Sequence, residues 1–194
     1  MRIVTYGAAC SLDGFIAASD GSVDWLHFSR DVQDVMAAYW ATIDTILMGR
    51  KTWEVALAQQ GSGGGDPGDS AMQTYVFSRT LRGIERPGVH LVSENAGDFV
   101  RALKSRKGKG ICLMGGGDLA QSLLAAGVID EVGLNIHPIL LGAGVPFFRD
   151  AGRIHLELVE NRTLDGGCVL ASYRVQHKRG ARRSSGAARS RRKS

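Results

Sequence analysis

The chain has 194 residues, of which 44% are hydrophobic and 22% charged, and it contains 26 Gly against 4 Pro. These values exclude a disordered polymer and favour one globular domain with many tight turns. The formal charge of +5 arises from eight Lys and Arg after His177, because the preceding residues have 16 basic against 19 acidic groups. We therefore expect residues 1–176 to form one domain without a nucleic-acid groove, and residues 177–194 to form a disordered basic tail.

The start of the sequence and its cysteines indicate a cytoplasmic protein that does not enter a membrane. The first six residues run directly into a strand pattern without an apolar leader, and no apolar run approaches 18 residues. Cys10, Cys112 and Cys168 are far apart and lack metal-ligand spacing. We expect them to be reduced thiols in the core.

Apolar, β-branched runs alternate with helical stripes along the domain. The predicted strands are residues 3–10, 15–17, 45–48, 74–78, 89–93, 111–114, 131–136, 155–159 and 169–175. The predicted helices are residues 31–40, 50–58, 98–106 and 118–126, and residues 60–70 are expected to form a surface loop or lid. This alternation predicts an α/β fold with a mostly parallel sheet, closed by an antiparallel hairpin from 155 to 175.

Two glycine-containing turns between a strand and a helix are candidate phosphate sites. Gly115-Gly116-Gly117, followed by Ala120, matches the Gly-x-Gly-x-x-Ala dinucleotide pattern, but the acidic residue expected about 20 positions later is absent. Two interpretations of this turn are therefore open. Its N–H groups bind an anion, or its glycines serve only tight packing.

The second candidate is the run Gly49-Arg50-Lys51-Thr52-Trp53, where a helix begins with two cations and a hydroxyl. A phosphate there would meet free N–H groups, the positive end of the helix dipole and charge-assisted bonds from Arg50 or Lys51. The alternative is a solvated first helical turn with Trp53 in the core.

The order of several motifs resembles the dihydrofolate reductase-like family, in particular the C-terminal reductase domain of the bacterial riboflavin deaminase-reductase. The resemblance covers about residues 2–175, and its motifs are Ser11-Leu12-Asp13-Gly14-Phe15-Ile16-Ala17, Asp24-Trp25-Leu26, Met48 to Glu54, Ser78-Arg79, Gly115-Gly116-Gly117 and His137 to Gly144. It implies a central, mostly parallel eight-stranded sheet with an antiparallel C-terminal strand, helices on both faces, and NADPH lying across the strand ends.

The resemblance also implies cofactor contacts for individual residues. The pyrophosphate would lie at Gly115, Gly116, Gly117, Asp118 and Leu119. The phosphates on the adenosine side would lie at Gly49, Arg50, Lys51 and Thr52, and the 2′-phosphate at Ser78 and Arg79, which implies a preference for NADPH over NADH. It further implies a cis peptide bond between Gly115 and Gly116.

Asp13 and Asp31 are the candidate catalytic residues, because reduction needs one proton supplied or relayed beside the hydride donor. The alternatives are turn chemistry for Asp13 and a helix N-cap for Asp31. In folate-reducing relatives the acid that grips the pterin lies five positions after a Trp; from Trp25 that position is Arg30. The acid stands one position later, at Asp31, and this displacement disfavours dihydrofolate as the substrate. We expect the two nearby histidines, His27 and His137, to be structural.

These observations predict an NADPH-dependent reductase that transfers a hydride to a small heterocyclic or carbonyl/imine substrate. The alternatives are 5-amino-6-(5-phosphoribosylamino)uracil reductase, dihydrofolate reductase, and a flavin or deazaflavin in place of NADPH. A different class is a polyanion-binding protein that acts through residues 178–194. The apolar hairpin at 155–175 predicts a homodimer.

Overall fold

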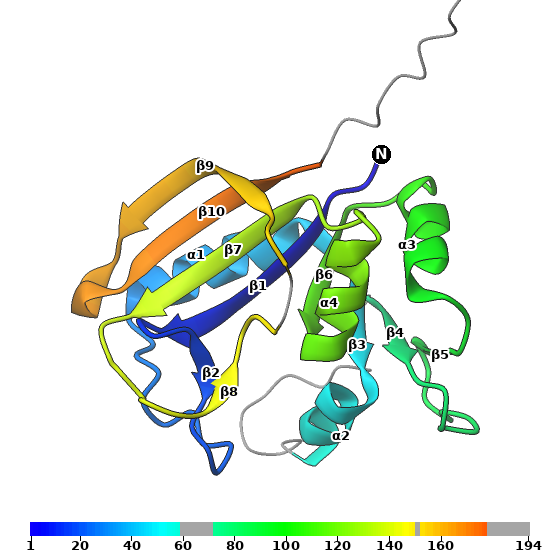
Figure 1. The fold of residues 1–194 in the computed structure, drawn as a ribbon, viewed down its shortest axis with the longest axis horizontal. Helices are drawn as coiled ribbons and strands as arrows, with labels where there is room; N and C mark the ends of the chain where they lie inside the picture. The colour runs from blue at the N-terminus through cyan, green and yellow to red at the C-terminus, as the bar shows by residue number, and fades with distance from the viewer. Residues whose placement is uncertain (59–71, 150–151, 178–194) are drawn as a thin grey trace, which may run out of the picture.

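The computed structural model describes residues 1–58, 72–149 and 152–177, and its core is an eight-stranded sheet in the order β5-β4-β3-β6-β1-β7-β10-β9 (Figure 1). The strands are β1 Val4–Ser11, β2 Phe15–Ala17, β3 Ile43–Gly49, β4 Gln73–Phe77, β5 Val89–Val92, β6 Gly110–Gly115, β7 Glu131–His137, β8 Val145–Pro146, β9 His155–Thr163 and β10 Val169–Gln176. The helices are α1 Arg30–Ala41, α2 Arg50–Ala58, α3 Ala96–Lys104, α4 Gly117–Ala125 and the 3₁₀ turn η1 Asp165–Gly167.

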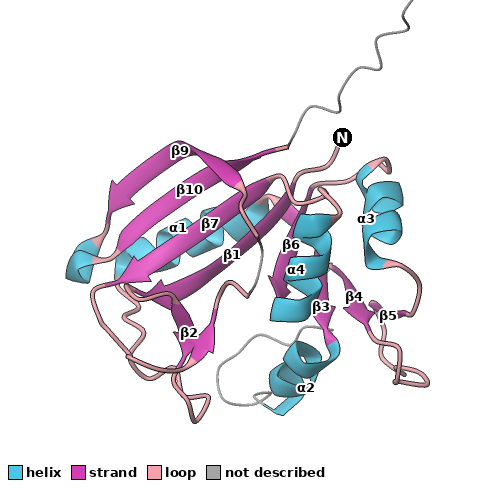
Figure 2. Cartoon of the chain, in the orientation of Figure 1, coloured by secondary structure: helices cyan, strands magenta, loops and turns pink. Residues whose placement is uncertain are grey.

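The sheet is parallel from β5 to β7, and only its last part is antiparallel. β1 pairs in parallel with β6 and β7, and β3 pairs in parallel with β4 and β6. β10 runs antiparallel to both β7 and β9 (Figure 2). The carboxyl ends of the parallel strands therefore meet at one edge of the sheet, which we call the carboxyl edge. The predicted fold class is confirmed.

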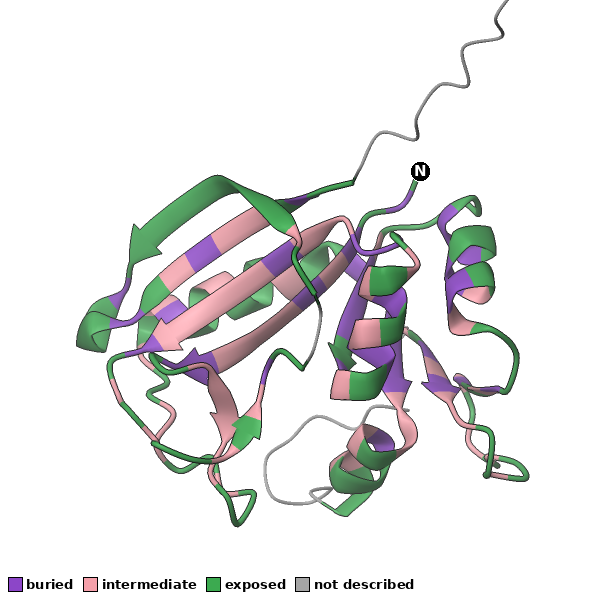
Figure 3. Cartoon of the chain, in the orientation of Figure 1, coloured by how far each residue is buried: buried purple, intermediate pink, exposed green. Residues whose placement is uncertain are grey.

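Helices cover both faces of the sheet, and consecutive residues of β3 show the two layers. Leu47 packs with α3 and α4, whereas Ile46 and Met48 pack around Trp53 of α2. Successive strand residues point to opposite faces, so these two clusters lie on different sides of the sheet. The buried positions concentrate in the central strands, while β9 is exposed along its whole length (Figure 3).

The structure refines several predicted boundaries. The predicted helix 98–106 begins earlier, at Ala96, because the Asn95 side chain accepts the Asp98 N–H and caps the helix.

The strand at 145–146, β8, was not predicted; it pairs with β2 in a separate two-stranded sheet. All three cysteines are buried and unpaired, as expected. The expected loop or lid at 60–70 and the tail at 178–194 lie outside the described residues.

Among the described helices, none is long and apolar enough to cross a membrane.

A buried ion pair joins α3 to the start of β7. Lys104 Nζ donates to Asp130 Oδ2 at 2.6 Å and to the Val128 carbonyl at 3.1 Å. Asp130 Oδ2 also accepts the Val4 N–H at 2.9 Å. One carboxylate therefore holds a helix cation and the first residue of β1 together, and it satisfies groups that could not be left unpaired in the core.

We expect Asp130→Ala to lower the free energy of unfolding by about 3–5 kcal/mol, because it leaves the Lys104 charge buried without a partner. Urea denaturation measures this change. Glu157→Ala is the control, since Glu157 pairs with Arg174 at the exposed hairpin; it should cost no more than about 1 kcal/mol. Equal effects of the two substitutions would contradict the role given to the buried pair.

Candidate functional site

Three loops that follow adjacent parallel strands meet at the carboxyl edge. β4, β3 and β6 are neighbours in the sheet, and the register pairs Phe77 with Gly49 and Met48 with Gly115. Each strand ends at its candidate segment, so Ser78-Arg79, Gly49 to Thr52 and Gly115 to Gly117 form one continuous rim. The structure brings together three segments that are far apart in the sequence.

The two glycine loops are in close contact because neither has a side chain at the point of approach. A Cβ on Gly116 would lie 3.3 Å from Gly49 Cα, and a Cβ on Gly115 would lie 3.4 Å from Thr52 Oγ1. Gly115 and Gly116 also have φ values of +146° and +98°, which residues with side chains rarely adopt. Glycine is therefore required here both by backbone conformation and by space.

The prediction of a cis peptide bond between Gly115 and Gly116 is wrong. The described residues contain no cis bond, so this peptide is trans. The two positive φ values turn the chain from β6 into α4, and a trans bond suffices for the approach to Gly49. This part of the inference from the resemblance is weakened, while the contact between the loops does not depend on it.

The first turn of α2 combines a solvated cation with a core residue. Arg50 donates to Glu54 at 2.6 Å across one turn of the helix, and Lys51 is exposed. Trp53 is only 4% exposed and belongs to the core. The core position considered for Trp53 is thus correct, and it fixes the helix so that Thr52 lies against the glycine turn.

The Ser78-Arg79 segment is a tight turn after β4. Ser78 N–H donates to the Val92 carbonyl at 3.0 Å, and Ser78 Oγ accepts N–H bonds from Thr80 and Leu81, each at 3.1 Å. These bonds fix the backbone around Arg79, whose side chain is exposed. The guanidinium therefore extends from a rigid turn at the rim.

Asp13 is a loop anchor. Its Oδ1 accepts the Ser11 hydroxyl at 2.6 Å, and its Oδ2 accepts the Gly142 N–H at 2.8 Å. The Leu141 N–H donates to Oδ1 at 3.2 Å. The Ser11 hydroxyl, followed by these backbone donors, lowers the pKa of Asp13, so its carboxyl group is a poor proton donor near neutral pH. The geometry matches the turn role considered for Asp13.

Asp31 lies in the first turn of α1, after Ser29 at the N-cap position. Its Oδ1 accepts the Ser29 hydroxyl and the Val32 N–H, and its Oδ2 accepts the Asp165 N–H at 2.7 Å. The Ser29 hydroxyl, then the Asp165 N–H, lowers the pKa of Asp31. Oδ2 thus ties α1 to η1, and Oδ1 is engaged at the start of the helix itself, which leaves this carboxylate poorly placed to grip a pterin.

His137, only 2% exposed, holds the segment before α1 against the end of β7. Its Nδ1 accepts the His27 N–H at 3.3 Å and lies 3.4 Å from Cys168 Sγ. The Trp25 ring meets it edge-on, with centroids 5.5 Å apart. Burial, followed by the nearby His27, lowers the pKa of His137. This burial and these contacts agree with the structural role expected for His137.

Arg149 is a rim residue that the sequence did not reveal. A Cβ on Gly117 would lie 3.0 Å from Arg149 Cδ, so the arginine side chain covers the third glycine of the turn. Its guanidinium is 3.9 Å from the carboxylate of Asp118. Thirty-two positions separate Arg149 from Gly117, and no local pattern marks it; the signal is the fold itself.

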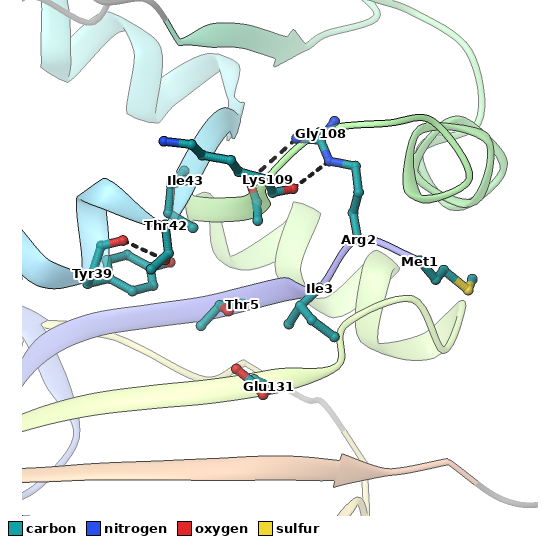
Figure 4. A pocket seen from close by; sticks show the side chains of 11 residues that line it. Met1, Arg2, Ile3, Thr5, Tyr39, Thr42, Ile43, Gly108, Lys109 and Glu131 are labelled. Carbon is teal, nitrogen blue, oxygen red and sulfur yellow. Dashed lines mark hydrogen bonds between the residues drawn. The ribbon is translucent and has the colours of Figure 1, made fainter.

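A hollow of about 410 Å³ lies at the opposite end of the sheet, beside the amino ends of β1, β6 and β7 (Figure 4). Arg2 in its wall is engaged by Asp44, by Thr45 Oγ1 at 2.7 Å and by the Lys109 carbonyl at 2.7 Å. Its charge is thus neutralised within the protein. None of the candidate residues borders this hollow, so the candidate site remains at the carboxyl edge.

Gly116→Ala should lower the free energy of unfolding by about 1–3 kcal/mol, because alanine is strained at this φ and its Cβ would press on Gly49. The control is Gly14→Ala, where φ is +85° but nothing lies within 4 Å of the added Cβ. Guanidinium denaturation should show the larger loss for Gly116→Ala. Equal losses would mean that the contact between the loops adds nothing to stability.

His137 should make the protein less stable as the pH falls below about 6.5, the ordinary imidazole value. Its pKa is lower in the folded state, so the unfolded chain binds the proton first and the free energy of unfolding falls with pH. Urea denaturation between neutral and mildly acidic pH measures the slope. His137→Gln should flatten it, whereas His155→Gln, at an exposed position of β9, should not; unchanged slopes in both variants would contradict the assignment.

Comparisons with known proteins agree with this geometry. Residues 2–170 match the family model of the RibD C-terminal domain. The uncharacterized protein YyaP of Bacillus subtilis is 35% identical over 181 residues, covering 89% of this chain and 94% of YyaP. The riboflavin biosynthesis protein RibD of Mycobacterium tuberculosis is 29% identical over 162 residues, which are 77% of this chain and 46% of that protein.

Two solved structures are similar over most of the chain. A putative riboflavin biosynthesis protein from Shewanella sp. PV-4 has a TM-score of 0.77 and 26% identity, covering 91% of this chain and all of that one (100%). Dihydrofolate reductase from Enterococcus faecalis, in a complex with NADP(H), has a TM-score of 0.62 at 15% identity, covering 90% and 97% of the two chains. This second likeness concerns the fold alone. The chain belongs to the RibD C-terminal domain family and has a dihydrofolate reductase-like fold.

Proposed function

We propose that this protein is an NADPH-dependent reductase that transfers a hydride to a small heterocyclic or carbonyl/imine substrate. The observation that supports it most directly is the meeting of three loops, after β4, β3 and β6, on one rim of the sheet. A long ligand with several phosphates can follow such a rim, and membership in the RibD C-terminal domain family agrees with a reductase.

The residues at the glycine turn fit a diphosphate. Gly115 and Gly116 carry no side chains, and the Cβ positions that they lack abut Thr52 and Gly49, so the backbones of the two loops lie close together at the rim. The first turn of α4 provides N–H groups that no helix carbonyl accepts, together with the positive end of its dipole. The Thr52 hydroxyl and the Lys51 ammonium supply further donors.

The Ser78-Arg79 turn supports NADPH over NADH. An exposed guanidinium on a rigid turn matches the geometry and charge of a phosphate monoester, which NADH lacks. The turn follows β4, one strand beyond Gly49, and would therefore hold the adenosine end while the glycine turn holds the diphosphate.

NADPH supplies the hydride when bound, and the residues of this chain bind and orient the reactants. Asp13 and Asp31 are both held in their charged form by hydrogen-bond donors. In this proposal they act by fixing the loops around the substrate end, and the proton comes from another donor such as solvent. Both oxygens of Asp31 already accept hydrogen bonds, which argues against dihydrofolate as the substrate.

A second candidate function is 5-amino-6-(5-phosphoribosylamino)uracil reductase. The family match and the RibD relative favour it. Its substrate bears a phosphate and would need a cation at the substrate end of the rim, separate from the cofactor phosphates.

The expected homodimer and the role of the tail remain predictions. β9 is the edge strand and exposes Leu156, Leu158 and Val159, a surface that a second copy would cover. Residues 178–194 are not among the described residues. Deleting them should abolish any polyanion binding and leave reductase activity intact.

Titration of the intrinsic tryptophan fluorescence with NADPH and NADH tests the proposal. We expect tighter binding of NADPH, and Arg79→Ala should weaken NADPH binding roughly tenfold or more while leaving NADH binding unchanged. Arg106→Ala, an exposed arginine after α3, is the control and should change neither constant. Consumption of NADPH in the presence of pterin and pyrimidine substrates then identifies the acceptor. Failure of the wild-type protein to bind either nucleotide would refute the proposed function.

A further inference from the structure

Arg149 follows the strand β8 and reaches back over the start of α4. A Cβ on Gly117 would lie 3.0 Å from its Cδ and 3.3 Å from its Nε, so the missing side chain of Gly117 makes the space in which the arginine lies. The Cβ directions of the three glycines thus face three different groups: Thr52, Gly49 and Arg149. In Figure 1 the segment after β8 and helix α2 approach the start of α4 from different directions.

The backbone before Arg149 is fixed by the core. Phe147 is buried and stacks on the Tyr6 ring of β1, with centroids 4.2 Å apart and planes inclined by 12°. The Tyr6 hydroxyl donates to the Phe147 carbonyl at 2.6 Å. Two residues later the chain emerges at the rim, so the position of Arg149 is set by the central strand of the sheet.

Among the described residues, the Arg149 guanidinium has one weak anionic neighbour, Asp118. Its ion pair with Asp118 is 3.9 Å long, and the Asp118 side chain is 88% exposed. Such a pair contributes little in water. A diphosphate at the N–H groups of α4 would be a stronger partner, because it carries two negative charges where Asp118 carries one. A guanidinium can donate two parallel N–H bonds to it.

We propose that Arg149 binds the diphosphate of the dinucleotide, as a second wall of the site beside Gly49 to Thr52. The inference rests on the proposed function, since it names a further contact for the same cofactor. It assigns Arg149 a role distinct from that of Arg79. The diphosphate occurs in both NADPH and NADH, whereas the 2′-phosphate occurs only in NADPH.

The test therefore compares the dissociation constants of NADPH and NADH. Arg149→Ala should raise the dissociation constants of NADPH and NADH by the same factor, about tenfold, and so leave their ratio unchanged, whereas Arg79→Ala should change the ratio. Gly117→Ala should act in the same direction with a smaller effect, because its Cβ displaces the arginine without removing the charge. Arg149→Lys should restore part of the affinity, since it keeps the charge and loses the paired N–H geometry.

Arg174→Ala is the matched control. Arg174 is 56% exposed, similar to the 52% of Arg149, and it also pairs with a carboxylate, but it lies on the hairpin β9–β10. It should leave both dissociation constants unchanged. Equal dissociation constants for Arg149→Ala and Arg174→Ala would overturn the inference while the proposed function stands.

Two further results separate the remaining possibilities. If Arg149→Ala spares nucleotide binding and raises only the KM of a phosphorylated substrate, the arginine binds substrate phosphate and the inference is wrong. If the wild-type protein binds no dinucleotide, the proposed function fails. Inorganic pyrophosphate then tests the anion site by itself: it should raise the Tm of the wild-type protein and of Arg174→Ala, but not that of Arg149→Ala, and no difference between these variants would overturn the inference.

Discussion

The close approach of Gly49 and Gly116 is the contact on which the candidate site depends. β3 and β6 are adjacent and parallel, so the loops after them leave the sheet at the same edge. Helices α2 and α4 begin directly after these glycines, and the positive ends of two helix dipoles therefore meet where the backbones touch. Any side chain at Gly116 would press on Gly49 and separate the two loops.

The long segment from β7 to Arg149 runs past the turn after β1 to the glycine turn after β6. Leu12 N–H donates to the Ile139 carbonyl at 2.9 Å, Asp13 accepts the Gly142 N–H, and Tyr6 holds Phe147. Three attachments to β1 and its following turn thus fix the segment along its length. Asp13, interpreted from the sequence as catalytic, is one of these attachments, and the same segment brings Arg149 to the glycine turn.

Charged residues are used differently at the two edges of the sheet. At the edge where the parallel strands begin, two buried cations stabilise the fold. Arg2 is neutralised by Asp44, and Lys104 is neutralised by Asp130. At the carboxyl edge, Lys51, Arg79 and Arg149 are exposed on fixed turns. Asp13 and Asp31 at the same end are satisfied by neutral donors rather than by these cations. The rim therefore presents positive charge to an anionic ligand.

The α/β class, nearly every helix and strand, the two glycine loops and the family could all be predicted from the sequence. These features are local: hydrophobic periodicity, glycine turns and the order of motifs are written in neighbouring residues. The anchoring bonds of Asp13 and Asp31, the trans Gly115–Gly116 bond and the cover of Arg149 over Gly117 became visible in the folded structure. The partners of Asp13, Asp31 and Arg149 lie more than thirty or even a hundred positions away. The type of a residue does not reveal which distant donor or glycine the fold will place beside it.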